Sequence, residues 1–141
     1  MIYPIYIYGS GVLRKECVEI DKDSPELAKL VEDMFATYLD RCIALFDRIW
    51  DAGYHFDEIN WPDDMGYKGT TFFSNEMYRE MLKPFHKKAC DWAHNHGVKV
   101  ILHSCGNILP FIPDLIEIGV DALNPLEVKA GMDALALKKQ Y

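Results

Sequence analysis

Apolar residues recur at two different spacings along the chain, and the two patterns alternate. Short stretches at Phe56–Trp61, Val98–His103 and Val120–Asn124 are rich in β-branched, aromatic and other apolar residues and are followed by turn residues. Such stretches are typical of β-strands. Ile2–Tyr8 has the same character despite a proline at position 4, and ends at a glycine, so it is predicted as a first strand.

The segments between these stretches carry apolar residues every three or four positions, which predicts amphipathic helices. The first helix begins at Ser24, a favourable N-cap that is followed by Pro25. We expect its buried face to consist of the residues that recur at this spacing: Leu27, Leu30, Val31, Met34, Tyr38, Cys42, Leu45 and Ile49. Acidic and basic residues, Asp47 among them, fill the opposite face.

Three more helices follow from the same pattern. Ser74 caps one that ends at Gly97, and Pro84 should interrupt it because proline lacks a backbone donor and crowds the preceding turn. A shorter helix is predicted over Asn107–Gly119, and a last one over Met132–Lys139.

Strands that alternate with helices predict βαβ units and a mainly parallel sheet in one domain spanning residues 1–141. A parallel sheet is covered on both faces, either in a doubly wound open sheet or in a (β/α)8 barrel. A complete barrel needs about 250 residues, so four βα units would form about half of one. The periodicity alone does not choose between the two.

Composition and charge exclude several classes of protein. The 141 residues include 22 acidic and 15 basic ones, a net charge of −7, and the basic residues do not cluster. We therefore expect neither a nucleic-acid partner nor a membrane partner. The apolar runs are short, the N-terminus lacks the basic start of a signal peptide, and four scattered cysteines do not suggest a disulfide framework. These features predict a cytoplasmic protein with reduced thiols.

His103 and Cys105 form the strongest candidate site. Side chains two residues apart on a strand lie on the same face, and these two follow the clearest predicted strand. Ligand sites in α/β folds lie at the carboxyl ends of strands. An imidazole and a thiolate at this spacing can bind zinc. The alternative is a small buried cysteine beside a hydrogen-bonded histidine.

Other polar residues follow the neighbouring strands. Asp63 and Asp64 come directly after the second predicted strand, and we expect Asp64 to face the same side as His103, where it could orient a ligand, accept a proton or complete a metal site. Asn124 and Glu127 follow the fourth predicted strand and fall at the same edge. For all four residues, ordinary turn chemistry is the alternative.

Several segments together resemble the uroporphyrinogen decarboxylase superfamily. They are the DDMG run at 63–66, Met81–Phe85, the HSCGN run at 103–107, Ile118–Pro125 and the GMD at 131–133. They occur in the family's order and span most of the chain from about residue 24. The resemblance implies a TIM (β/α)8 barrel, of which this chain would form about half.

The superfamily contains two chemistries, and the resemblance implies either of them. In its corrinoid-dependent methyltransferases, an H-x-C motif and a much later cysteine hold zinc, which activates a thiol; the corrinoid (cobalamin) is supplied by a partner protein. His103 and Cys105 match that motif, and no cysteine follows Cys105. The resemblance thus implies His103 and Cys105 as metal ligands. From their positions at the strand ends, we predict Asp64 and His103 as catalytic residues and Asn124 as a contact to the cofactor.

The second chemistry is cofactor-free decarboxylation of uroporphyrinogen in porphyrin (heme) biosynthesis. That tetrapyrrole carries eight carboxylates, and carboxylates call for bidentate arginine contacts. The chain contains few arginines: Arg14, Arg41, Arg48 and Arg79. We therefore favour the methyltransferase branch, with a corrinoid protein or a small-molecule thiol as partner.

A truncated, non-catalytic fragment is the third hypothesis. Half of a closed sheet would leave two unpaired strand edges and an uncovered apolar interior. We expect such a chain to self-associate or to pair with a missing half-barrel, to be marginally stable, and to be a poor catalyst by itself.

Overall fold

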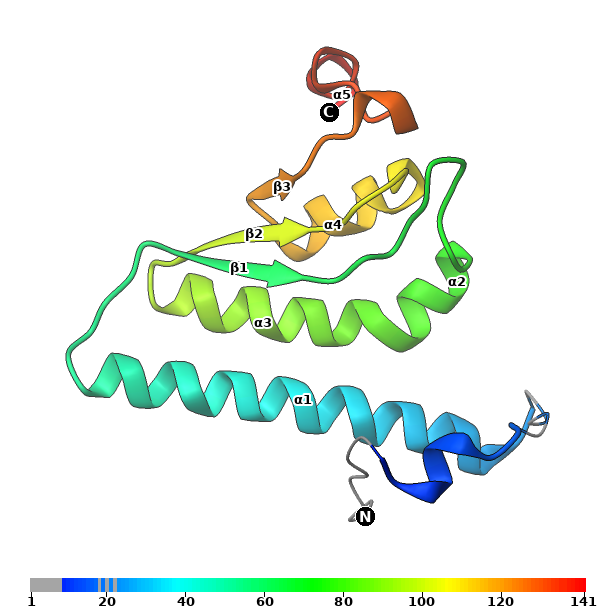
Figure 1. Ribbon diagram of the computed structural model, residues 1–141. Helices are drawn as coiled ribbons and strands as arrows, with labels where there is room; N and C mark the ends of the chain where they lie inside the picture. The colour runs from blue at the N-terminus through cyan, green and yellow to red at the C-terminus, as the bar shows by residue number, and fades with distance from the viewer. Residues whose placement is uncertain (1–8, 18, 20, 22) are drawn as a thin grey trace.

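The computed structural model describes residues 9–17, 19, 21 and 23–141, as an elongated arrangement of helices beside a small sheet (Figure 1). The strand predicted at Ile2–Tyr8 lies outside the described residues. The elements are, in chain order, η1 (Gly11–Arg14), α1 (Pro25–Asp51), β1 (Glu58–Pro62), α2 (Asn75–Met77), η2 (Tyr78–Leu82), α3 (Lys83–Asn95), β2 (Lys99–His103), η3 (Leu109–Phe111), α4 (Ile112–Ile118), β3 (Ala122–Asn124), η4 (Val128–Ala130) and α5 (Ala134–Gln140). Within the described part of the chain, no helix combines the length and apolar character needed to cross a membrane.

The three strands form one parallel sheet in the order β1-β2-β3. In the register, Pro62 of β1 pairs with His103 of β2, and His103 pairs in turn with Asn124 of β3. The parallel arrangement predicted from the alternation is confirmed, with each strand slightly displaced from or shorter than its predicted range. Three strands are consistent with part of an α/β fold, and the barrel implied by the resemblance stays a prediction.

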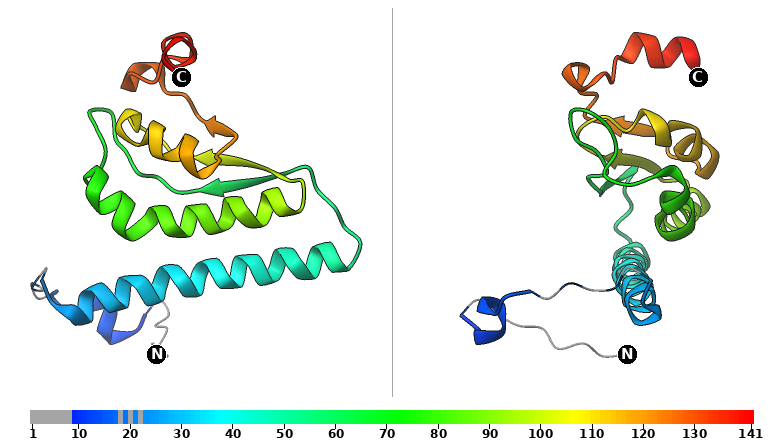
Figure 2. Two further views of the ribbon diagram at one scale, coloured as in Figure 1. Left: turned by 180° about the vertical axis from the view of Figure 1, so that it is seen from behind. Right: turned by 90° about the vertical axis from the view of Figure 1, so that its right-hand side faces the viewer.

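Helices cover one face of this sheet. Ile59 and Trp61 of β1 and Val100 and Leu102 of β2 are buried, while the alternate residues of both strands are more exposed. Figure 2 shows α3 and α4 on one side of the strands, with α1 packed along α3. Among the described residues, no helix covers the other face, which carries Asn60 and His103 on alternate positions from the buried set.

The face of α1 that packs is only partly the predicted one, because Leu27, Leu30, Val31, Cys42 and Ile49 are half-buried as expected. Three residues of the predicted stripe are more than half exposed: Met34 (60%), Tyr38 (56%) and Leu45 (53%). Cys42 of the predicted stripe packs against the core, together with five residues outside that stripe: Phe35, Leu39, Ile43, Phe46 and Trp50. The reason is an aromatic contact: the Phe46 ring lies 5.2 Å from that of Trp92 on α3, and the Trp92 Nε1–H donates to Asp47 Oδ1 at 2.7 Å. Asp47 therefore lies at the helix interface and not on a solvated face.

The predicted interruption near Pro84 takes the form of a π-helical turn. Residues Tyr78–Leu82 form this turn, η2, directly before α3, and the Lys83 N–H bonds back to the carbonyl of Tyr78. Such a turn holds one more residue than an α-helical turn. The extra residue therefore shifts the helix face of the side chains before the turn relative to those of α3 after it.

Candidate metal centre

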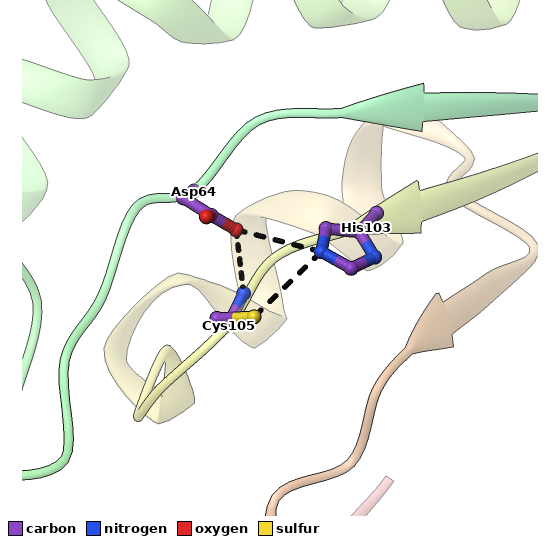
Figure 3. Close-up of side chains that lie close together, drawn as sticks. All are labelled: Asp64, His103 and Cys105. Atoms are coloured by element: carbon purple, nitrogen blue, oxygen red, sulfur yellow. Dashed lines mark hydrogen bonds and ion pairs between the residues drawn. The ribbon is translucent and has the colours of Figure 1, made fainter.

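Three side chains converge at the carboxyl ends of β1 and β2 (Figure 3). Asp64 comes from the loop after β1, His103 is the last residue of β2, and Cys105 follows two residues later. His103 Nε2 lies 3.6 Å from Asp64 Oδ1 and 3.6 Å from Cys105 Sγ. One ligand atom from each of the three lies within 4.8 Å of the other two. The predicted convergence of these three residues is thus confirmed.

The strand alternation continues past the end of β2 and places the two motif residues on one side. Ser104, between them, is 2% exposed, and its Oγ accepts a hydrogen bond from the Met65 N–H at 2.9 Å. The Cys105 N–H donates to Asp64 Oδ1 at 2.9 Å. The loops after β1 and β2 are therefore bonded to each other through both a buried hydroxyl and a candidate ligand.

Glycine allows these two loops to touch. Gly106 has φ +78°, and a Cβ added there would lie 2.5 Å from the carbonyl carbon of Gly66 and from the N of Tyr67. The Asn107 N–H donates to the carbonyl of Tyr67 at 2.8 Å. Only a residue without a Cβ fits this conformation and this approach. The glycine of the HSCGN run therefore allows the two loops that carry the site to pack against each other.

The electrostatic surroundings of Cys105 favour a cation. Burial raises the pKa of the Cys105 thiol, and the carboxylates of Asp64 and Glu127 raise it further. Both charged groups that act on this thiol are negative, so the neutral form is favoured until a positive charge arrives. The His103 side chain is 35% exposed and that of Asp64 is 58% exposed, which leaves the group open to a ligand from solvent.

The donor set and two of its three ligand-atom distances are compatible with a zinc ion. Ligands about 2.0–2.3 Å from a tetrahedral zinc stand roughly 3.3–3.8 Å apart. The two distances of 3.6 Å from His103 Nε2 fall in this range. A thiolate, an imidazole and a carboxylate together suit zinc better than magnesium or calcium, which prefer oxygen ligands alone.

The other predicted site residues lie in different surroundings. Glu127 is close enough to Cys105 to act on its thiol. Asn124 is exposed at the end of β3, next to His103 in the register, and its backbone carbonyl accepts from the Ser104 N–H at 3.0 Å. Asp63 does not join the group, because its carboxylate contacts α3 instead.

The sequence patterns did not indicate a role beside the site for His86 or Tyr78. Asp63 Oδ2 lies 3.0 Å from His86 Nε2, and His86 Nδ1 lies 3.1 Å from the hydroxyl of Tyr78. His86 is 4% exposed. A signal was present, because His86 falls four residues after Leu82 and three before Ala89, on the apolar stripe of its helix. A histidine within a buried stripe needs a polar partner.

Comparison with curated proteins finds short stretches of similarity to peptide deformylases. The enzyme from Karelsulcia muelleri is 49% identical over 37 residues, which is 26% of this chain and 20% of that protein. Peptide deformylase 2 from Streptomyces avermitilis is 50% identical over 36 residues, or 26% of this chain and 19% of that protein. The match thus spans about a fifth of these relatives' length, too little to assign the chain to their family. No solved structure matches the chain.

A family comparison covers far more of the molecule. The family described as Uroporphyrinogen decarboxylase (URO-D) matches residues 12–135. This range includes α1, all three strands and the three converging side chains. Membership supports an enzymatic activity without determining the reaction. The chain belongs to the uroporphyrinogen decarboxylase family.

Proposed function

We propose that the protein acts in zinc-assisted methyl transfer between a corrinoid protein and a thiol or related acceptor. The observation that carries this proposal is the convergence of Asp64, His103 and Cys105 at the ends of two parallel strands. The H-x-C motif of this chain resembles the one that holds zinc in the methyltransferases of the superfamily. The thiolate, imidazole and carboxylate found here suit zinc.

Each residue has a role in this proposal. His103 and Cys105 hold the zinc, with Asp64 as third ligand and Glu127 as the nearest further carboxylate. Zinc bound there would lower the pKa of a substrate thiol and stabilise its thiolate. Asp64 also accepts the Cys105 N–H and so orients the loop that carries the thiol. Asn124, exposed beside His103, is available to bind a polar group of the substrate or the corrinoid.

Uroporphyrinogen decarboxylation is the second candidate, and the arginine positions speak against it. Arg14 belongs to η1, and Arg41 and Arg48 belong to α1. Arg79 of η2 donates through Nε to both carboxylate oxygens of Asp114 at 3.0 Å. None of these elements carries the three converging residues, so the arginines are not gathered where a substrate with eight carboxylates would need them.

Zinc titration tests the metal part of the proposal. We expect about one zinc per chain, with a dissociation constant at least about tenfold weaker after Cys105→Ala or His103→Ala. Cys42→Ala, which removes a thiol on α1 outside the site, is the matched control and should bind zinc like the wild type. Unchanged zinc binding in both site variants would reduce the pair to a packed cysteine beside a hydrogen-bonded histidine.

An activity assay separates the three hypotheses. The chain, and any longer form of the protein, is assayed for transfer of a methyl group from a methylated corrinoid to a thiol and, in parallel, for turnover of uroporphyrinogen. Methyl transfer that is lost in Cys105→Ala supports the proposal. Turnover of uroporphyrinogen without methyl transfer favours the decarboxylase, and inactivity of every form with both substrates favours a non-catalytic fragment.

A further inference from the structure

Asp63 and Asp64 are neighbours in sequence, but their side chains leave the loop in different directions. Asp64 Oδ1 lies 3.6 Å from His103 Nε2, whereas Asp63 Oδ2 lies 3.0 Å from His86 Nε2 on α3. His86 is 4% exposed, and its Nδ1 lies 3.1 Å from the hydroxyl of the fully buried Tyr78. A hydrogen-bond chain therefore leads from the core to the residue beside a candidate metal ligand.

The chain of hydrogen bonds has one consistent direction. Burial raises the pKa of Tyr78, and the neighbouring carboxylates and Cys90 add to the effect, so its phenol keeps the proton. The Asp63 carboxylate can only accept, so His86 Nε2 carries a proton and donates it to Asp63. In the neutral tautomer with this proton, His86 Nδ1 is an acceptor and receives the hydrogen bond of the Tyr78 hydroxyl. Every polar atom in the chain has a partner of the opposite kind.

The π-helical turn makes the first of these contacts feasible. Tyr78 and His86 are eight residues apart, and in a regular α-helix this separation turns them about 80° from each other. The turn at Tyr78–Leu82 adds one residue, so the pair is related roughly like residues seven apart, which lie within about 20°. The helix irregularity thus brings the phenol onto the face that carries His86.

We propose that His86 is a positioning residue for the metal centre: by holding Asp63 on the α3 side of the loop, it turns Asp64 toward His103 and Cys105. The proposal rests on the proposed function in one respect, because it takes Asp64 as a ligand. One planar peptide joins the two Cα atoms, so a change in the backbone dihedrals of this loop redirects both side chains together. Without His86, the Asp63 side chain, 32% exposed, can turn to water and let Asp64 rotate away.

The backbone of the loop would keep its other attachments. The Asp63 N–H donates to the carbonyl of His103 at 2.8 Å, and the Met65 N–H to Ser104 Oγ. Loss of His86 should therefore leave the loop near its place but with Asp64 less well oriented. Loss of a residue that orients a metal ligand weakens metal affinity about 10- to 100-fold.

Two substitutions of His86 separate its two hydrogen bonds. The amide nitrogen of glutamine takes the position of Nε2, so His86→Gln keeps the bond to Asp63. The amide of asparagine takes the position of Nδ1, so His86→Asn keeps only the bond to Tyr78. We expect zinc affinity within about threefold of the wild type for His86→Gln and about 10- to 100-fold weaker for His86→Asn. The Co²⁺ absorption spectrum of His86→Asn should match that of Asp64→Ala.

Cys90→Ala is the matched control for simple loss of packing. Cys90 is 1% exposed and lies on the same helix, one turn after His86. Its substitution should lower the melting temperature but leave zinc affinity and the Co²⁺ spectrum unchanged. If His86→Asn also loses only thermal stability, the positioning role is overturned and His86 is a structural residue.

A measurement without metal keeps this inference distinguishable from the proposed function. The Cys105 N–H donates to Asp64 Oδ1, so its amide resonance in metal-free protein reports where Asp64 lies. We expect that resonance to move in His86→Asn toward its position in Asp64→Ala, and to stay in place in His86→Gln and Cys90→Ala. If the wild type binds neither zinc nor Co²⁺ but the resonance moves as expected, the proposed function fails and the positioning of Asp64 stands. An unmoved resonance overturns the positioning.

Discussion

The carboxylate of Asp114 links α4 to η2 and α3, and substitution of Asp114 tests the packing that supports the site. Asp114 is 3% exposed, and both of its oxygens lie 3.0 Å from Arg79 Nε. Lys83 Nζ donates to Oδ1 at 2.7 Å. Two cations from η2 and α3 thus meet one buried anion on α4.

The expected loss follows from how exposed the partners are. Removing one member of a buried ion pair destabilises a protein by about 3–5 kcal/mol, because the remaining charge stays buried. Arg79 is 52% exposed and can be hydrated when its partner is gone, whereas Lys83 is 17% exposed. We therefore expect Asp114→Ala to lower the free energy of unfolding by about 2–3 kcal/mol. For a chain of this size that is a decrease of roughly 6–9 °C in melting temperature.

Thermal unfolding followed by circular dichroism measures the effect, and Glu117→Ala is the control. Glu117 accepts from the same Lys83 Nζ at 2.9 Å, but its side chain is 71% exposed. A surface pair of this kind contributes at most about 1 kcal/mol, so the melting temperature should change by less than about 3 °C. Equal losses in the two variants would refute the reasoning, because burial would then not decide the contribution of the carboxylate.

The pH dependence provides a second check on the same carboxylate. Hydrogen bonding to Arg79 lowers the pKa of Asp114 more than its burial raises it, and Lys83 lowers it further. A lowered pKa means that the stabilisation is complete above the ordinary pKa, about 4, and is lost as the pH falls through the folded value. The difference between wild type and Asp114→Ala should accordingly shrink below about pH 4. A constant difference across that range would contradict the assigned cause.

Three further predictions address the site and the sheet. Gly106→Ala should lower the free energy of unfolding in urea by about 2 kcal/mol and weaken zinc binding, because the added Cβ would lie 2.5 Å from backbone atoms. Gly97→Ala is its control: Gly97 has φ +73° but no atom within 4 Å, so this variant should show the backbone strain alone, about 1 kcal/mol. Burial raises the pKa of Asp121, but hydrogen bonds from Lys99 and His94 outweigh this effect and lower the pKa to about 2. Asp121→Asn should therefore have a smaller free energy of unfolding than the wild type at pH 7, and the two values should converge between about pH 4 and pH 2. Sedimentation velocity should show self-association that rises with concentration, because the described sheet has two open edges; a monodisperse, cooperatively unfolding monomer would contradict this.

The arrangement of the sheet and of three site residues could be predicted because strand alternation determines it. Because Ile59 and Trp61 face the helices, Asn60 between them faces the other way. The same alternation places His103 and Cys105 on one side. Carboxyl ends of parallel strands share one edge, which brings Asp64 to the pair. These relations depend on backbone geometry and not on the details of packing.

The interface of α1 and the direction of Asp63 depend on partners distant in sequence. Two rows of apolar residues run along α1, and periodicity does not say which row meets Trp92, 46 residues after Phe46. The loop after β1 offers two adjacent aspartates, and the one that turns to the helix, Asp63, contacts His86 on α3. The π-helical turn also places Tyr78 on a different helix face from the one that a constant helical period predicts.

The position of Asp64 bears on how a metal site could work in this chain without the later cysteine that the resemblance implies. No cysteine follows Cys105 in the sequence, so a second thiolate would have to come from elsewhere. A carboxylate brings the same charge as a thiolate, and Asp64 with Cys105 would give the proposed zinc two negative ligands beside a neutral imidazole. The charge balance of a two-thiolate site is therefore kept, with a harder oxygen in place of one sulfur. Because that oxygen also accepts the Cys105 N–H, its orientation and the placement of the thiol change together. If His86 positions Asp64 as we propose, its contact with Asp63 therefore bears on both proposed ligands, Asp64 and Cys105.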